Sequence, residues 1–243
     1  MPARQFPTGV VMPYPRRAEL LSWAAEKEGR YLIEDDYDSE FKYRGRPVPS
    51  LQSMDAGGKV IYLGTFSKSI APAIRVSYLI LPKDLLPAFH EKAGFLSCTV
   101  PRLDQAILNE FIQKGYFERY LNRMRNHYRS KHDRMLELLK PLEGKFDIRG
   151  QGAGLHLVLH LKNSDACLDA VGGQEKIGQD EIEQKLADAA RAQGVIVYPL
   201  SEQNLPENPS SRRQASPAIL LGYAALTEEE IREGTQKLIQ AWS

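Results

Sequence analysis

Residues 31–41 read Tyr-Leu-Ile-Glu-Asp-Asp-Tyr-Asp-Ser-Glu-Phe, a short apolar run that ends in a dense group of acids. The apolar residues 31–33 predict a buried strand. Open α/β sheets bind their ligands beyond the carboxyl ends of the strands, which is where these acids fall. Several carboxylates at one strand end repel each other unless cationic groups offset them. A ligand site and a loop solvated by water therefore both remain open at this point.

A second strand with a polar end follows at residues 60–69, which read Val-Ile-Tyr-Leu-Gly-Thr-Phe-Ser-Lys-Ser. Lys68 follows the apolar run, so it also lies at the carboxyl end of a strand, with hydroxyl residues beside it and Arg75 seven positions later. An arginine fork and hydroxyls suit a phosphate group. A lysine in this company indicates a Schiff-base lysine for a phosphorylated aldehyde, whereas a solvated loop lysine is the alternative.

The composition is that of a soluble globular protein, with 42% hydrophobic and 26% charged residues in a chain of 243. The net charge of +1 provides no excess of positive charge over the chain as a whole for binding nucleic acid or an anionic membrane. The two cysteines, Cys98 and Cys167, are far apart, so we expect no disulfide framework and no metal site. A reducing cytoplasm fits best, and we find no targeting segment and no run of the ~20 apolar residues that a membrane helix needs.

The first third of the chain alternates helical and strand patterns. A helix beginning near Pro15 precedes the strand at 31–33, and further strands are predicted at 60–63 and 76–81. Short apolar runs of this kind favour an α/β fold with a mostly parallel sheet covered on both faces.

The remainder is predicted as helices followed by an α+β module. Helical spacing covers 84–92, 103–114 and 116–139, and the last of these is rich in arginine. A nucleic-acid contact is conceivable for that basic helix, but its interspersed acids favour a solvated face. The α+β module begins near Pro141; its predicted elements are a half-buried strand at 155–161, a helix at 180–193, strands at 195–198 and 219–223, and a helix capped by Thr227.

The ordered set of polar segments resembles fold-type I enzymes that use pyridoxal 5'-phosphate (PLP), in the class I/II aminotransferase group. The most specific likeness is to the aminotransferase-like domain of the MocR/GabR group of bacterial transcription regulators. The segments that carry the likeness are 5–9 (QFPTG), 31–41, 64–72 (GTFSKSIAP) with Arg75, 154–156 (GLH) and 217–223.

The resemblance assigns a role to each matching residue. It implies that Lys68 is the catalytic lysine that forms the Schiff base with PLP, that Asp35 faces the pyridine nitrogen, and that Tyr37 hydrogen-bonds the phenolic oxygen of the ring. It also implies that the phosphate is bound by Thr65, Ser67 and Arg75. The neighbouring acids Asp36, Asp38 and Glu40 are then expected to serve the structure of the loop.

Two parts of the family pattern differ in this sequence. Related proteins grip the ligand carboxylate with an arginine of the C-terminal domain, expected just before the strand at 217, but Ser216 occupies that position. Arg212 and Arg213 lie a few residues earlier and are candidates for this contact, with an exposed loop as the equal alternative. Phe6 stands where many aminotransferases place an asparagine, and His156 is expected to be a packed strand residue rather than a ligand.

The resemblance also implies an architecture. Residues 1–100 would be the C-terminal part of a PLP-binding large domain, 101–140 linking helices, and 141–243 a smaller α+β domain. The family's winged-helix DNA-binding domain and the first part of its large domain match nothing here. We therefore expect this chain to be the C-terminal part of a longer protein, and we expect the chain itself to make no direct contact with nucleic acid.

Three functions are compatible with these observations. The first is an effector domain that binds PLP and a small amino compound, as a homodimer. The second is a working aminotransferase, in which Lys68 also moves the proton. The third is a non-catalytic module that keeps the fold without the cofactor.

Overall fold

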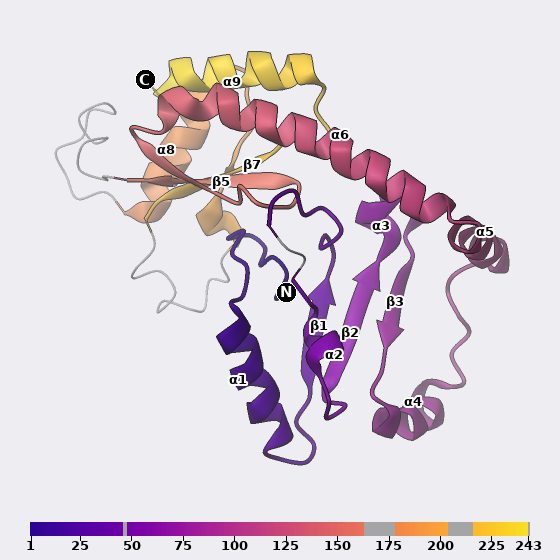
Figure 1. Cartoon of the computed structure of the whole chain (residues 1–243). Helices are drawn as coiled ribbons and strands as arrows, with labels where there is room; N and C mark the ends of the chain where they lie inside the picture. The colour runs from indigo at the N-terminus through magenta and orange to yellow at the C-terminus, as the bar shows by residue number, and fades with distance from the viewer. Residues whose placement is uncertain (46–47, 163–177, 204–215, 243) are drawn as a thin grey trace. The chain divides into compact units, whose positions relative to one another are not determined.

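The computed structural model describes residues 1–45, 48–162, 178–203 and 216–242 (Figure 1). Contacts divide the chain into two compact units. Unit 1 comprises Met1–Gln5 and Val11–Asn126, and unit 2 comprises Phe6–Val10 and His127–Ser243. The division falls inside one helix, α6 (Tyr116–Leu139), whereas the sequence suggested divisions near residues 100 and 141. Helical periodicity identifies the helix but does not show where its contacts pass from one unit to the other.

Unit 1 contains a three-stranded sheet in the order β1-β2-β3, formed by β1 (Leu32–Asp36), β2 (Val60–Thr65) and β3 (Ser77–Ile80) (Figure 1). The three predicted strands are confirmed. β1 and β2 pair in parallel, but β2 and β3 are antiparallel, so only one of the two pairings matches the expected direction. The segment 66–76 that joins β2 to β3 is shorter than the dozen or more residues that a parallel crossover requires.

The helices of unit 1 are mostly short. Pro15 lies in the first turn of α1, as predicted, because its missing N–H is not needed there. The helices and 3-10 turns of this unit are α1 (Tyr14–Ala25), α2 (Leu51–Met54), α3 (Phe66–Ser69), η1 (Pro72–Ile74), η2 (Lys83–Leu85), α4 (Leu86–Ala93) and α5 (Arg102–Gln113), followed by the first part of α6.

The sheet of unit 1 is not covered on both faces by the described residues. Ile33 is 66% exposed, and Leu63 and Leu79, on the same face by strand pairing, are also exposed. Every residue of β3 is exposed. The expectation of a doubly covered sheet is therefore wrong for this part of the chain, because an apolar strand pattern shows which residues need cover and not whether a neighbour supplies it.

Buried Arg17 fixes the beginning of the chain to α1. Its guanidinium donates to the carbonyl oxygens of Met12 (2.9 Å) and Pro2 (2.6 Å), and also to that of Pro49. Burial lowers the pKa of this guanidinium, against the opposing effect of nearby carboxylates. A single buried side chain thus joins three separate segments of the backbone through their carbonyl groups.

Unit 2 contains an antiparallel sheet in the order β4-β5-β7-β6. Its strands and helices are β4 (Phe146–Arg149), β5 (His156–Leu161), β6 (Tyr198–Pro199), β7 (Ala218–Gly222), α8 (Gln179–Ala192) and α9 (Glu228–Trp242), with η3 (Lys140–Leu142) and η4 (Leu200–Gln203). β4 was not predicted, and β6 is shorter than predicted. Thr227 caps α9, as expected: its hydroxyl accepts from Glu230 N (3.2 Å), and the Glu230 carboxylate accepts from Thr227 N (2.7 Å).

The core of unit 2 lies on both faces of β5. Leu157, Leu159 and Leu161 pack into the main cluster with residues of α8, α9 and the end of α6, while Val158 packs on the other face with Leu200 and Ala218. All six residues of β5 are buried, so the prediction of a half-buried strand is wrong. The alternating leucines identify one buried face, but the residues between them are buried as well.

None of the helices that the structure describes is both long and apolar enough to span a lipid bilayer. Within the same residues, no group of three or more histidine, cysteine or acidic side chains is placed to hold a metal ion.

Candidate functional site

The candidate site lies at the carboxyl edge of β1 and β2, where the strand pairing puts Asp35 beside Leu63 and Asp36 beside Gly64. Most of the clustered acids at this edge have structural partners. The Glu34 carboxylate is buried and accepts from Leu51 N and Gln52 N at 2.9 Å each, which caps α2.

Two further acids of the cluster, Asp36 and Asp38, also have partners. Asp36 accepts from the Tyr62 hydroxyl (2.8 Å) and from Ser39 N (3.2 Å). Asp38 is 3% exposed and pairs with Arg4, with 3.3 Å between guanidinium nitrogen and carboxylate oxygen. Burial raises the pKa of Asp38 to about 6, although Arg4 opposes the shift. These contacts support the structural roles expected for the acids around Asp35.

Asp35 differs from its neighbours. It is exposed, and its carboxylate makes no hydrogen bond or ion pair with any residue that the structure describes. Its side chain lies on the sheet face that also carries Leu63 and Thr65, because paired residues of neighbouring strands point to the same side. Asp35 is therefore the acid of this cluster that combines an exposed position with a carboxylate available to a ligand.

Lys68 lies one turn beyond β2, in α3. The Thr65 hydroxyl accepts from Ser67 N (3.1 Å) and so caps this short helix, which fixes the direction in which the chain leaves the strand. Lys68 is exposed, and within the described ranges its ammonium group has neither an ion pair nor a hydrogen bond. The lysine is thus positioned by the backbone and not by a partner.

Arg75 lies at the other end of the β2–β3 connection, and its side chain reaches Ser67. Its guanidinium donates to the Ser67 hydroxyl at 3.5 Å, and its backbone is in the left-handed region, with φ 50° and ψ 33°. A residue with a Cβ atom pays a conformational cost there. The structure therefore brings together three of the predicted phosphate ligands, Thr65, Ser67 and Arg75.

Tyr37 contributes a buried hydroxyl group. By geometry this hydroxyl meets no hydrogen-bond partner among the described residues. Burial raises the pKa of Tyr37, and the Asp38 carboxylate raises it further. A buried hydroxyl without a partner is uncommon in a native protein and calls for a ligand or water to complete it.

An aromatic group on the opposite face of the sheet supports the site and was not predicted. The rings of Tyr62 and Tyr78 lie 6.1 Å apart, and Tyr78 lies 5.3 Å from Phe66, which precedes Ser67. Gly64 makes this packing possible, because a Cβ atom there would be 2.2 Å from Cζ of Tyr78. The glycine in the β2 pattern was the one signal in the sequence.

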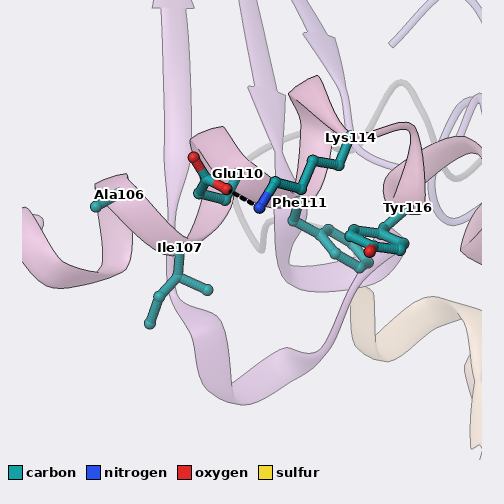
Figure 2. A pocket seen from close by; sticks show the side chains of 6 residues that line it. All are labelled: Ala106, Ile107, Glu110, Phe111, Lys114 and Tyr116. Carbon is teal, nitrogen blue, oxygen red and sulfur yellow. Dashed lines mark ion pairs between the residues drawn. The ribbon is translucent and has the colours of Figure 1, made fainter.

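A separate hollow of about 390 Å³ lies on α5 and the start of α6 (Figure 2). Figure 2 shows the rings of Phe111 and Tyr116 lying together, 6.3 Å apart, and an ion pair between Glu110 and Lys114 at the rim. None of the residues that line it belongs to the predicted site.

The two arginines predicted to contact the substrate, Arg212 and Arg213, lie outside the described residues. Ser216 is described, and its hydroxyl is 3.2 Å from Nδ1 of His160, whose pKa is lowered by burial. In unit 2, Phe6 packs edge-on against His156 at 5.5 Å, so this histidine is packed, as expected.

Comparison with known proteins identifies the class. The model of the aminotransferase class I and II family matches residues 5–238, so the chain belongs to that family. Membership implies PLP as the cofactor, and the buried free hydroxyl of Tyr37 with the assembled Ser67–Arg75 pair fits such a group.

The most similar curated relatives include regulators. The chain is 40% identical over 243 residues to the uncharacterized HTH-type transcriptional regulator YhdI of Bacillus subtilis, covering 100% of this chain and 47% of that protein. It is 33% identical to the probable rhizopine catabolism regulatory protein MocR of Rhizobium meliloti, covering 99% of this chain and 44% of that one. The chain thus spans about half the length of the curated relatives it matches.

Solved structures similar to the chain are aminotransferases. LysN, the α-aminoadipate aminotransferase of Thermus thermophilus, solved with N-(5'-phosphopyridoxyl)-L-leucine, matches with a TM-score of 0.76 and 28% identity over 100% of this chain and 57% of that one. The kynurenine aminotransferase of Pyrococcus horikoshii, in a complex with PMP, matches with a TM-score of 0.77 and 26% identity, covering 98% and 53%. The expected fold class, part of a fold-type I aminotransferase, is confirmed.

Proposed function

We propose that this chain is the PLP-binding, effector-sensing domain of a MocR/GabR-type transcription regulator. The observation that carries the proposal is the edge of the β1–β2 sheet, where a free lysine, a free aspartate and a hydroxyl–arginine pair follow neighbouring strands. The identity to the regulators YhdI and MocR, 40% and 33%, is higher than the 26% and 28% to aminotransferases matched over nearly all of the chain, which favours the regulator.

Each side chain of this edge has a task that suits its surroundings. PLP, when bound, supplies an aldehyde that reacts with amines and a ring that withdraws electrons. The amine of Lys68 is the covalent attachment point, and Asp35 holds a proton on the pyridine nitrogen. The phosphate is bound by Thr65, Ser67 and Arg75, where the planar fork of the arginine can contact two oxygens.

Tyr37 completes the set, because its buried hydroxyl can donate to the phenolic oxygen of the ring. The effector is a small compound with an amino group, since only an amine can replace Lys68 on the cofactor. We further propose a cytoplasmic homodimer. DNA would be bound by residues other than those of this chain, because the related proteins are HTH-type regulators of about twice its length.

A working aminotransferase is the second candidate, favoured by the aminotransferases among the solved structures. In that case Lys68 would also carry a proton between two carbons of the substrate, as a general base. Conversion of an added amino acid to its keto acid by the PLP-loaded protein, with turnover when a second keto acid is supplied, would favour the enzyme over the sensor.

Absorbance spectroscopy tests the proposal. Adding PLP to the chain should produce the visible band of a lysine-bound cofactor, which borohydride reduction fixes on the residue. Lys68→Ala should lose the band, whereas Lys92→Ala, a change of an exposed lysine on α4, should keep it. A wild-type chain without the band, or an unchanged band in Lys68→Ala, contradicts the proposal and favours the module that lacks a cofactor.

A further inference from the structure

We propose that Arg4 and Asp38 form a positioning pair that keeps the hydroxyl proton of Tyr37 available to the ring oxygen of the cofactor. This inference rests on the proposed function, since it concerns the same site. It assigns a role to the N-terminal segment Met1–Gln5, which belongs to unit 1 although Phe6–Val10 belongs to unit 2.

Both members of the pair are buried, and Asp38 adjoins Tyr37 in the sequence. Arg4 is 2% exposed and Asp38 3%, and the guanidinium donates to the carboxylate at 3.3 Å. Burying two charges is expensive unless they are paired. The pair joins the N-terminal segment to this loop, across a separation of 34 residues in sequence.

Asp38 is the acceptor that competes for the proton of Tyr37. Its carboxylate is close enough to raise the pKa of the tyrosine, while the Arg4 charge lowers it. With Arg4 bound to the carboxylate, the Tyr37 hydroxyl lies close to Asp38 but does not meet hydrogen-bond geometry with it or with any other residue described here. Without Arg4, the buried carboxylate would take the hydroxyl as its remaining polar partner, and the ring oxygen would lose its donor.

The rest of the loop is held independently of Arg4. The carbonyl of Asp38 accepts from Phe41 N (3.0 Å), Asp36 accepts from Ser39 N (3.2 Å), and Arg125 donates to the carbonyl of Glu40 (2.9 Å). Removing the Arg4 side chain should therefore redirect the Tyr37 hydroxyl without unfolding the loop.

Several charged groups among the described residues act on the pair and on Tyr37. Asp36 faces the pair from the end of β1 and Glu40 from the loop, Arg125 faces Glu40 from α6, and Asp35 acts on Tyr37 from β1. Since none of these is changed in the variants below, a shift in titration reports the Arg4–Asp38–Tyr37 relation.

The test is the pH midpoint at which the visible band of PLP bound to Lys68 changes, measured in wild type, Arg4→Met, Tyr37→Phe and the double variant. A phenol that donates to the ring oxygen favours the deprotonated form, so Tyr37→Phe should raise the midpoint by about one pH unit or more. Arg4→Met should also raise the pH midpoint. The double variant should match Tyr37→Phe alone, because both changes remove the same hydrogen bond.

Controls separate the outcomes. Arg16→Met, which removes an exposed arginine paired with Glu19, should leave the midpoint unchanged. If Arg4→Met does not fold, Arg4→Gln replaces it in this set of variants. Arg4→Gln keeps a hydrogen-bond donor for Asp38 but no charge, and it should shift the midpoint in the same direction. Additive shifts, or no shift in the Arg4 variant when wild type has the band, overturn the inference alone. Absence of the band in wild type overturns the proposed function, and the inference with it.

Discussion

Arg75 donates to the hydroxyl of Ser67 at 3.5 Å from a backbone held at φ 50° and ψ 33°. It is the one non-glycine residue with positive φ in the part of the chain that the structure describes. Left-handed backbone at a residue with a Cβ atom costs about 1–2 kcal/mol, so a glycine would be the more stable choice for the turn alone. The stability of the turn alone therefore does not explain an arginine at this position.

Arg75→Gly tests this relation, because it removes the guanidinium and relieves the backbone at once. We expect the dissociation constant for PLP to rise about ten- to a hundredfold, the effect of losing hydrogen bonds from a charged donor. Thermal stability should stay the same or rise. The measurements are a PLP titration followed by absorbance and a melting curve.

Arg75→Lys is the matched variant, because it keeps the charge without the planar fork, and its affinity should fall between those of wild type and Arg75→Gly. Wild-type affinity in Arg75→Gly would show that the arginine does not contact the phosphate.

Gly64→Ala tests the aromatic support behind the site. The new Cβ atom would lie 2.2 Å from Cζ of Tyr78, so the ring must move away from Phe66. We expect the free energy of unfolding to fall by about 1–3 kcal/mol, the usual cost of overpacking. Urea denaturation measures the change, and PLP affinity should fall with it because Phe66 adjoins Ser67.

Gly222→Ala is the control for this substitution. Gly222 lies in β7, and a Cβ atom there meets nothing within 4 Å. Its free energy of unfolding should change little. An equal loss of stability in the two variants would show that the Tyr78 contact is not the cause.

The sequence predicted the apolar elements of the fold but not all of the strand pairings. Strands β1, β2 and β3 and helix α6 appear in the residue pattern, because apolar periodicity is local. The antiparallel direction of β3 follows from the short β2–β3 connection, whereas the existence of β4 depends on its pairing with β5 and is not marked in its own four residues.

The residues of the candidate site were also predictable only in part. Lys68, Thr65, Ser67 and Arg75 lie within eleven residues, and the structure brings the last three together as predicted. The sequence alone left Asp35 among four other acids. Three of those acids, Glu34, Asp36 and Asp38, are distinguished by partners from elsewhere in the chain, and these pairings appear only in three dimensions.

Glu183 in α8 is expected to be a main source of stability in unit 2. Its carboxylate is fully buried and accepts from Ser201 N (2.7 Å), in η4, and from Ala218 N (2.8 Å), at the start of β7. Glu183→Ala leaves both N–H groups, of which that of Ala218 is buried, without this acceptor. We expect the free energy of unfolding to fall by about 3 kcal/mol, measured by urea denaturation.

Glu181→Ala removes an exposed glutamate from the same helix and should cost less than about 1 kcal/mol. Similar losses in the two variants would mean that helix propensity, rather than the buried hydrogen bonds, accounts for the effect of Glu183.

Asp38 should make stability fall as pH rises, the reverse of the usual behaviour of a paired carboxylate. Burial raises its pKa from 3.8 to about 6, so between these values the folded chain holds a proton that the unfolded chain has released. The stability difference between wild type and Asp38→Asn should therefore decline by about 3 kcal/mol over this range and level off above it. Denaturation at a series of pH values measures it, with Asp188→Asn, an exposed aspartate, as the flat control. A difference that grows with pH would mean that the attraction of Arg4 for the carboxylate outweighs the cost of burying it.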